Sequence, residues 1–154
     1  MLSTAWLLHN IGMNTSSHLS ASSDDLIQQS PAHRAVLNRL QALLPAESVI
    51  TDAAGLRPYE TDGLTAIREL PWVVVLPETE AQVADIVRCC AEHSVPIIPR
   101  GAGTGLSGGA RPHQEGVVLG LSKMSAILDI DPQNRIAKVQ PGVRNLAITQ
   151  AAQA

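Results

Sequence analysis

The chain reads Pro99-Arg100-Gly101-Ala102-Gly103-Thr104-Gly105-Leu106-Ser107-Gly108-Gly109-Ala110 directly after the apolar run 95–98. Five of the nine residues from 101 to 109 are glycine. Because glycine reaches positive φ freely and has no Cβ to block a close approach, such a run after a strand lets successive backbone N–H groups turn toward one point. A group of amides arranged in this way suits an anion, most often a phosphate. A flexible loop is the alternative. The few polar residues, the arginine at the start and the strand signals on both sides favour a phosphate-binding loop.

The loop does not match the phosphate-binding motif of the P-loop NTPases. That motif reads G-x-x-x-x-G-K-[ST], and its lysine reaches the phosphates. Gly103 and Gly108 have the required spacing, but Gly109 and Ala110 follow where the lysine and the hydroxyl residue belong. We therefore reject this class.

The dinucleotide fingerprint G-x-G-x-x-G is matched literally by Gly103, Gly105 and Gly108. A nicotinamide-binding domain needs this motif to open a helix. Pro112 and Gly116 leave no room for a helix of ordinary length before the next apolar run. We expect the loop to join two strands, and a strand after it would exclude the nicotinamide alternative.

A β-α-β unit precedes the loop. Residues 72–76 form a continuous apolar run, which is typical of a strand covered on both faces. Thr79 and Gln82 have the spacing of a capping box and predict a helix over 80–93, with Val83, Ile86, Val87 and Cys90 on its apolar face. Val95 to Ile98 predicts the second strand. We expect the strands 72–76 and 95–98 to be parallel neighbours.

Further elements flank this unit. Ser30 and Pro31 predict the start of a helix that Pro45 ends, and residues 48–51 predict a short strand. Residues 52–70 are expected to form a long loop. After the glycine loop we expect a strand over 116–121, a hairpin over 126–140 and a helix over 143–154, with Leu146, Ile148 and Ala151 toward the core. Residues 1–29 are rich in serine, and we expect a disordered or loosely attached arm.

Composition excludes several classes of protein. The chain has 154 residues, a formal net charge of −3 and 2% aromatic residues, which argues against a nucleic-acid-binding surface. No apolar run approaches the roughly 20 residues of a membrane span. Cys89 and Cys90 are adjacent, and neighbouring side chains on a helix diverge too far for a relaxed disulfide. We expect Cys90 in the core and Cys89 at its boundary, as suits a reducing compartment, and no metal site.

The loop resembles the pyrophosphate loop of the FAD-linked oxidases of the p-cresol methylhydroxylase and vanillyl-alcohol oxidase type. Within that family it is most similar to the FAD-binding subunits of glycolate oxidases and to D-lactate dehydrogenases. The stretch Pro58-Tyr59-Glu60-Thr61-Asp62-Gly63-Leu64, the elements around Pro77 and the stretch Val139-Gln140-Pro141-Gly142-Val143-Arg144-Asn145-Leu146 support the resemblance. It covers the chain from about Leu37 onward and implies an α+β fold, the first part of a p-cresol methylhydroxylase-type FAD-binding domain, over residues 30–154.

The resemblance implies the cofactor-binding residues. They are Arg100, Gly101, Ala102, Gly103, Thr104, Gly105, Ser107, Gly108, Gly109, Pro77, Pro141 and Gly142. Arg100 admits two roles, a contact to phosphate or flavin and a surface residue that satisfies loop carbonyls. A second interpretation of Pro77 and the pair 141–142 is that they are plain strand terminators. Tyr59, Glu60 and Asp62 form either a surface loop, which we favour, or a cover over the flavin. His113 lies just past the loop.

The mode of FAD attachment also follows from the resemblance. Some relatives tether FAD covalently through a histidine four residues after the loop arginine, in an Arg-x-Gly-Gly-His pattern. That position is Thr104 here, so we expect non-covalent FAD.

The implied function is FAD binding within a flavoprotein oxidoreductase that acts on a small 2-hydroxy acid of the glycolate or D-lactate type. We assign no catalytic residue to this chain. The resemblance allows partner oxidase subunits and a cytoplasmic location, with attachment at the membrane surface through such subunits. Because the last helix has no stop signal, we expect an incomplete domain that is inactive alone. A non-catalytic truncated or assembly module is the second alternative, beside the nicotinamide-binding domain.

Overall fold

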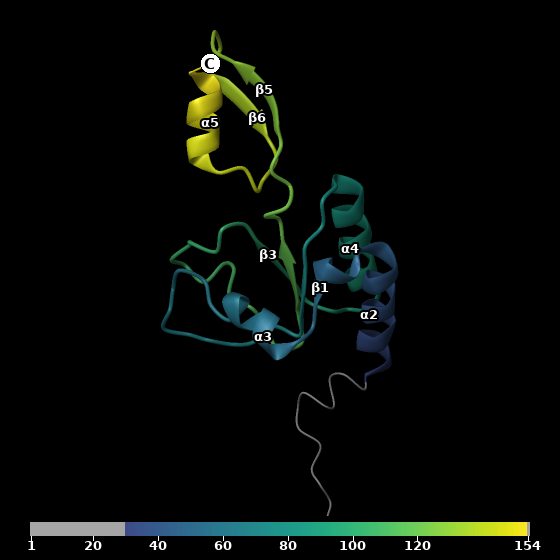
Figure 1. Cartoon of the computed structure of the whole chain (residues 1–154). Coiled ribbons are helices and arrows are strands. Elements are labelled where there is room, and N and C mark those ends of the chain that lie inside the picture. The colour runs from purple at the N-terminus through teal and green to yellow at the C-terminus, as the bar shows by residue number, and fades with distance from the viewer. Residues whose placement is uncertain (1–29, 154) are drawn as a thin grey trace, which may run out of the picture.

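The computed structural model describes residues 30–153 (Figure 1). The expected arm over residues 1–29 lies outside the described residues. The helical elements are α2 (Pro31–Leu43), the 3-10 turn η1 (Ala46–Ser48), α3 (Ala53–Leu56), the 3-10 turn η2 (Arg57–Tyr59), α4 (Glu80–Glu92) and α5 (Asn145–Ala152). The strands are β1 (Val49–Ile50), β2 (Val73–Val75), β3 (Ile97–Arg100), β4 (Val117–Gly120), β5 (Ile127–Asp131) and β6 (Ile136–Val139).

The four strands of the main sheet lie in the order β1-β2-β4-β3. β2 and β3 are both parallel to β4, and β1 is antiparallel to β2. The prediction that residues 72–76 and 95–98 are neighbours is therefore wrong, although their parallel direction is confirmed. β4 lies between them, and its Val118 pairs with Val74 on one side and Ile98 on the other. All four residues of β4 are buried, which explains why this strand takes a central position.

Both faces of the sheet are covered, as the continuous apolar run predicted. On one face α2 and α4 pack side by side (Figure 1), and Val36, Leu40 and Ile86 are fully buried against the strands. On the other face Val74 and Val118 are covered by residues of the segment 50–59, including Leu56. The capping box of α4 is confirmed, because the Gln82 N–H donates to Thr79 Oγ1 and the Gln82 side chain accepts from the Thr79 N–H.

The buried stripe of α4 is rotated from the expected one. Val87 was expected on the apolar face and is 43% exposed, whereas Cys89, expected at the boundary, is buried together with Cys90. Ile86, Cys89 and Cys90 form the stripe because positions three and four apart share a helix face. Burial raises the pKa of the Cys90 thiol to about 12.

Residues 52–70 are not one irregular loop, because α3 and η2 occupy residues 53–59. Asp52 caps α3, and its Oδ1 accepts a hydrogen bond from the Gly55 N–H at 2.9 Å. Aspartate is a preferred N-cap residue, so Asp52 is a local signal for a helix start within the stretch that was expected to be a loop.

The hairpin and α5 form a separate layer, drawn at the top of Figure 1. β5 and β6 pair antiparallel as predicted, across a turn in which Asp131 accepts hydrogen bonds from Asn134. α5 begins at Asn145 rather than residue 143, and Leu146, expected toward the core, is 66% exposed. Ile148 and Ala151 are half-buried. No described segment packs over Leu146, so its apolar character did not predict burial.

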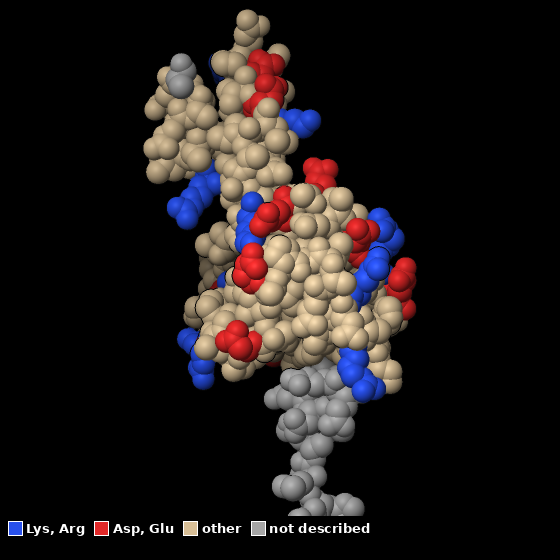
Figure 2. Space-filling view, turned by 45° about the vertical axis from the view of Figure 1, so that its right-hand side comes forward, with Lys and Arg blue, Asp and Glu red and all other residues tan. Residues whose placement is uncertain are grey.

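Charged side chains of both signs are interspersed over the face drawn in Figure 2. Among the helices of residues 30–153, none has the length and apolar character needed to cross a bilayer.

Candidate functional site

The glycine loop lies at the edge of the sheet where the parallel strands end. β3 runs to Arg100, two residues farther than expected, and the Leu121 N–H donates to the Arg100 carbonyl at 3.0 Å. The loop therefore starts at Gly101, directly from a hydrogen-bonded strand. Open α/β sheets bind ligands outside the carboxyl ends of their parallel strands.

The residues after the loop exclude the nicotinamide alternative. Residues 110–116 form no helix, and β4 starts at Val117. The loop joins strand to strand, as expected from Pro112 and Gly116.

The backbone N–H groups of the glycine loop are unpaired in the part of the chain that the structure describes. Gly103 and Gly108 have φ angles of +71° and +75°, values that favour glycine. Within residues 30–153, the amides of residues 101–109 donate no hydrogen bond to the chain, and most of these residues are exposed. A series of unpaired amides at a strand end is the arrangement that binds phosphate groups.

The protein's own packing does not explain three of the loop glycines. A Cβ added at Gly101, Gly105 or Gly109 would meet no atom within 4 Å. By contrast, a Cβ at Gly116 would lie 2.6 Å from a methyl group of Ile98. Glycines beside open space leave room for a ligand to approach the backbone closely, so the loop fits a phosphate-bearing cofactor.

Arg100 supports the loop from within the protein. Its Nη1 donates to the Thr61 carbonyl at 2.7 Å, and its guanidinium lies 5.5 Å from the centre of the Tyr59 ring. A Cβ at Gly103 would collide with this guanidinium. This carbonyl belongs to the segment between β1 and β2 and not to the loop, so Arg100 does not satisfy a loop carbonyl as the surface role required.

The segment 59–70 packs against the glycine loop and is not a free surface loop. Asp62 is 5% exposed, so the favoured interpretation of this residue was wrong. Glu69 binds the far end of the loop, because it accepts hydrogen bonds from the Gln114 N–H at 2.9 Å and from Arg111 Nη2 at 3.1 Å. Arg100 and Arg111 thus attach the two ends of the loop to one neighbouring segment.

We expect this attachment to weaken in acid. The hydrogen bond from the Gln114 N–H, followed by the contact with Arg111, holds the pKa of Glu69 below its ordinary value despite partial burial. A carboxylate with a lowered folded-state pKa stabilises the fold above its unfolded pKa of about 4.3, and this stability is lost as the pH falls through the folded pKa. Below about pH 4.3 the melting temperature of the wild type should therefore fall more steeply than that of Glu69→Gln, as circular dichroism would measure. Parallel curves for the two proteins would contradict the expectation.

The other proposed cofactor residues lie near the same edge. Pro77 is fully buried just beyond the end of β2, and Pro141 is exposed. The Gly142 N–H donates to the Met124 carbonyl at 2.8 Å, and a Cβ at Gly142 would collide with the carbonyl oxygens of Leu121, Ser122 and Met124. Packing against the chain that follows β4 accounts for this glycine. A contact of Pro77, Pro141 or Gly142 with cofactor stays a prediction.

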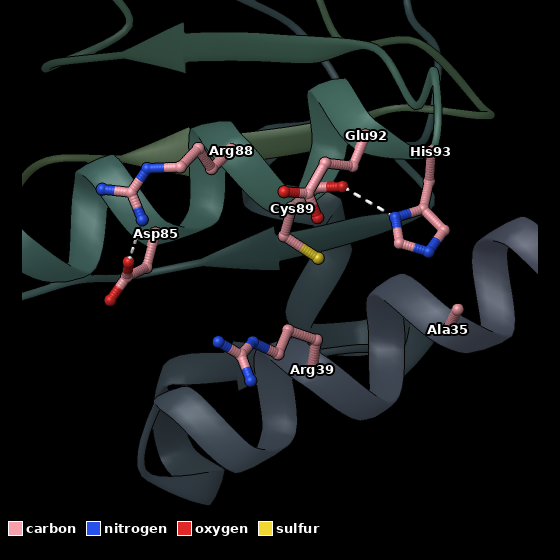
Figure 3. A pocket seen from close by; sticks show the side chains of 7 residues that line it. All are labelled: Ala35, Arg39, Asp85, Arg88, Cys89, Glu92 and His93. Atoms are coloured by element: carbon pink, nitrogen blue, oxygen red, sulfur yellow. Dashed lines mark hydrogen bonds and ion pairs between the residues drawn. The ribbon is translucent and has the colours of Figure 1, made fainter.

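A pocket of about 330 Å³ lies between α2 and α4 in the helical layer (Figure 3). It is lined by Ala35, Arg39, Asp85, Arg88, Cys89, Glu92 and His93. Arg88 pairs with Asp85, and His93 Nδ1 is hydrogen-bonded to the Cys89 carbonyl at 2.9 Å. The positive and negative side chains that line this pocket are therefore equal in number, with Arg39 and Arg88 beside Asp85 and Glu92. Across the described part of the chain, no three His, Cys, Asp or Glu side chains are placed to hold a metal ion.

Comparison with known proteins finds an FAD-binding family by sequence. A family model described as "FAD binding domain" matches residues 71–154, more than half of the chain. The chain is 49% identical over 116 residues to glycolate oxidase subunit GlcD of Escherichia coli (strain K12), an alignment that covers 75% of this chain and 23% of that protein. It is 43% identical over 94 residues to D-lactate dehydrogenase of Archaeoglobus fulgidus, covering 60% of this chain and 21% of that protein.

Among solved structures, substrate-bound p-cresol methylhydroxylase superposes with a TM-score of 0.71 at 31% identity, covering 79% of this chain and 24% of that chain. The expected α+β fold of this type is confirmed. The chain spans about a quarter of the length of these relatives.

Proposed function

Because the chain belongs to the FAD binding domain family, we propose that residues 100–109 hold the pyrophosphate of FAD within a protein that oxidises a small 2-hydroxy acid. One observation carries the first part of this proposal. Gly101, Gly105 and Gly109 border open space while the amides of the loop have no acceptor in the described chain. These features are what a backbone needs to surround a phosphate group.

The strength of such a site is sufficient for a cofactor. A hydrogen bond to a charged group contributes about 1.5–3 kcal/mol, and a micromolar dissociation constant corresponds to about 8 kcal/mol. Four or five amides of residues 101–105 therefore supply much of a micromolar affinity. Ser107, Gly108 and Gly109 close the loop over the anion, and Arg100 fixes its first turn through Thr61.

Pro77, Pro141 and Gly142 complete the proposed contacts at the edge of the sheet. Pro77 follows β2, and Pro141 and Gly142 follow β6, where the Gly142 N–H donates to the Met124 carbonyl in the chain that connects β4 to β5. Their role in the proposal is to shape the wall along which the rest of the cofactor extends.

The substrate class rests on the relatives. Bound FAD supplies a hydride acceptor, and the protein binds and orients it. The sequence relatives include a glycolate oxidase subunit, a D-lactate dehydrogenase and a D-2-hydroxyglutarate dehydrogenase, and the substrates in these three names are 2-hydroxy acids. The word "subunit" in the first of these names supports partner chains in an oxidase complex. We place no catalytic residue within this chain.

Flavin content tests the proposal. The protein as its gene encodes it should purify with flavin absorbance, or should bind added FAD with micromolar or tighter affinity when followed by quenching of flavin fluorescence. Glycolate or D-lactate should then bleach the absorbance of the loaded protein. Absence of FAD binding would favour the non-catalytic module, and binding without bleaching by any 2-hydroxy acid would contradict the substrate class.

A further inference from the structure

Residues Thr61–Leu64, here called the brace, approach the glycine loop near its start, its middle and its end. At the start of the loop, the Thr61 carbonyl accepts the hydrogen bond from Arg100 Nη1 at 2.7 Å. Near its end, a side-chain methyl of Leu64 lies 3.9 Å from the position of a Cβ at Gly108. Two points about eight residues apart on the loop therefore meet four consecutive residues from a distant part of the sequence.

The middle of the brace makes the closest approach. A Cβ at Gly63 would lie 2.7 Å from both the Thr104 carbonyl oxygen and the Gly105 carbonyl oxygen. No side chain fits there, because these neighbours are backbone atoms that cannot rotate away. When the carbonyl oxygens of the loop pack against the brace, the peptide planes are fixed with their N–H groups directed away from it.

Asp62 gives the brace its shape. Its Oδ1 accepts a hydrogen bond from the Leu64 N–H at 2.9 Å, and Thr61 Oγ1 donates to the Asp62 carbonyl at 3.1 Å. The side chain is buried, and its Oδ2 has no hydrogen-bond partner among the described residues. A buried carboxylate oxygen without a partner is costly, and the hydrogen bond that Oδ1 accepts in the turn offsets part of this cost.

We propose that the brace holds the glycine loop in its ligand-binding form and that Asp62 and Gly63 are positioning residues for the cofactor. The inference rests on the proposed function. Neither residue touches the ligand in this account. Both act through the carbonyl side of the loop, which leaves the amide side open.

The test compares variants of the protein as its gene encodes it. Gly63→Ala should weaken FAD binding about tenfold or more, because the loop must move away from the new methyl group. Gly55→Ala is the matched control. It also creates a close contact, 2.5 Å from a methyl group of Ile50, but the atoms nearest to the added Cβ belong to Ile50 and Asp52 and not to the loop, so FAD affinity should be unchanged. In the FAD-free protein, Gly63→Ala should also speed tryptic cleavage after Arg100, which Gly101 follows, and Gly55→Ala should not.

Asp62 supplies a second pair of variants, which remains informative where Gly63→Ala does not fold. Asp62→Asn retains an acceptor for the Leu64 N–H and should keep wild-type FAD affinity, whereas Asp62→Ala should lose affinity as Gly63→Ala does. Wild-type affinity in Gly63→Ala or in Asp62→Ala, with Gly105→Val still defective, would overturn the brace and leave the phosphate site standing. If the wild type binds no FAD, the proposed function fails, and unchanged tryptic cleavage in Gly63→Ala would overturn the brace as well.

Discussion

Gly105→Val is expected to abolish FAD binding while leaving the fold intact. The open side of Gly105 is the side on which we place the pyrophosphate, and a branched side chain there would occupy the space the phosphate needs. The loss of several charge-assisted hydrogen bonds of about 1.5–3 kcal/mol each would reduce affinity by more than a hundredfold. Flavin absorbance of the purified variant and an FAD titration measure the effect.

The fold should survive because no atom lies within 4 Å of the added Cβ. The melting temperature of the FAD-free variant should therefore match that of the FAD-free wild type. Ala35→Val, at an exposed position of α2, controls for the added bulk and should bind FAD normally. Unchanged flavin content in Gly105→Val would show that the loop is not the phosphate site.

Acid precipitation is expected to release all of the flavin from the loaded protein. The position of the tethering histidine in some similar oxidases is occupied here by Thr104, which is exposed. A hydroxyl group cannot replace the imidazole nitrogen that forms the covalent bond to the flavin. Hydrogen bonds and packing alone then retain FAD, and both are lost on denaturation.

The measurement separates the pellet from the supernatant. Yellow colour should appear in the supernatant only. Colour retained in the pellet, with flavin mass on a tryptic peptide, would contradict non-covalent binding. His113 would be the first residue to examine. Its Nδ1 accepts a hydrogen bond from the Glu115 N–H at 3.1 Å, so a tether through that nitrogen would require this contact to break.

Local signals predicted the elements well. The capping box at Thr79 and Gln82, the proline at the start of α2 and the breakers after the glycine loop each act over a few residues, so the sequence is enough to interpret them. The rotation of the α4 stripe shows the limit of such reasoning. Cys89 and Val87 differ little in apolar character, and the position of α2 decides which of them is buried.

Long-range placement was not predictable from the same signals. Sequence order suggests that the two strands of a β-α-β unit are neighbours. Instead β4, which follows both in the sequence, lies between β2 and β3 and pairs with each of them. The contact of Gly63 with the carbonyls of residues 104–105 joins segments about forty residues apart. The polar composition around Asp62 indicated a surface loop, and only the fold shows that this carboxylate is buried.

The central claim is that the amides of residues 101–109 bind the pyrophosphate of FAD. Hydrogen exchange followed by mass spectrometry tests it directly, with the FAD-free protein compared before and after addition of FAD. Peptides that contain residues 101–109 should gain strong protection, and peptides from the pocket between α2 and α4 should not change. Full occupancy by FAD with no added protection at residues 101–109 would contradict the account.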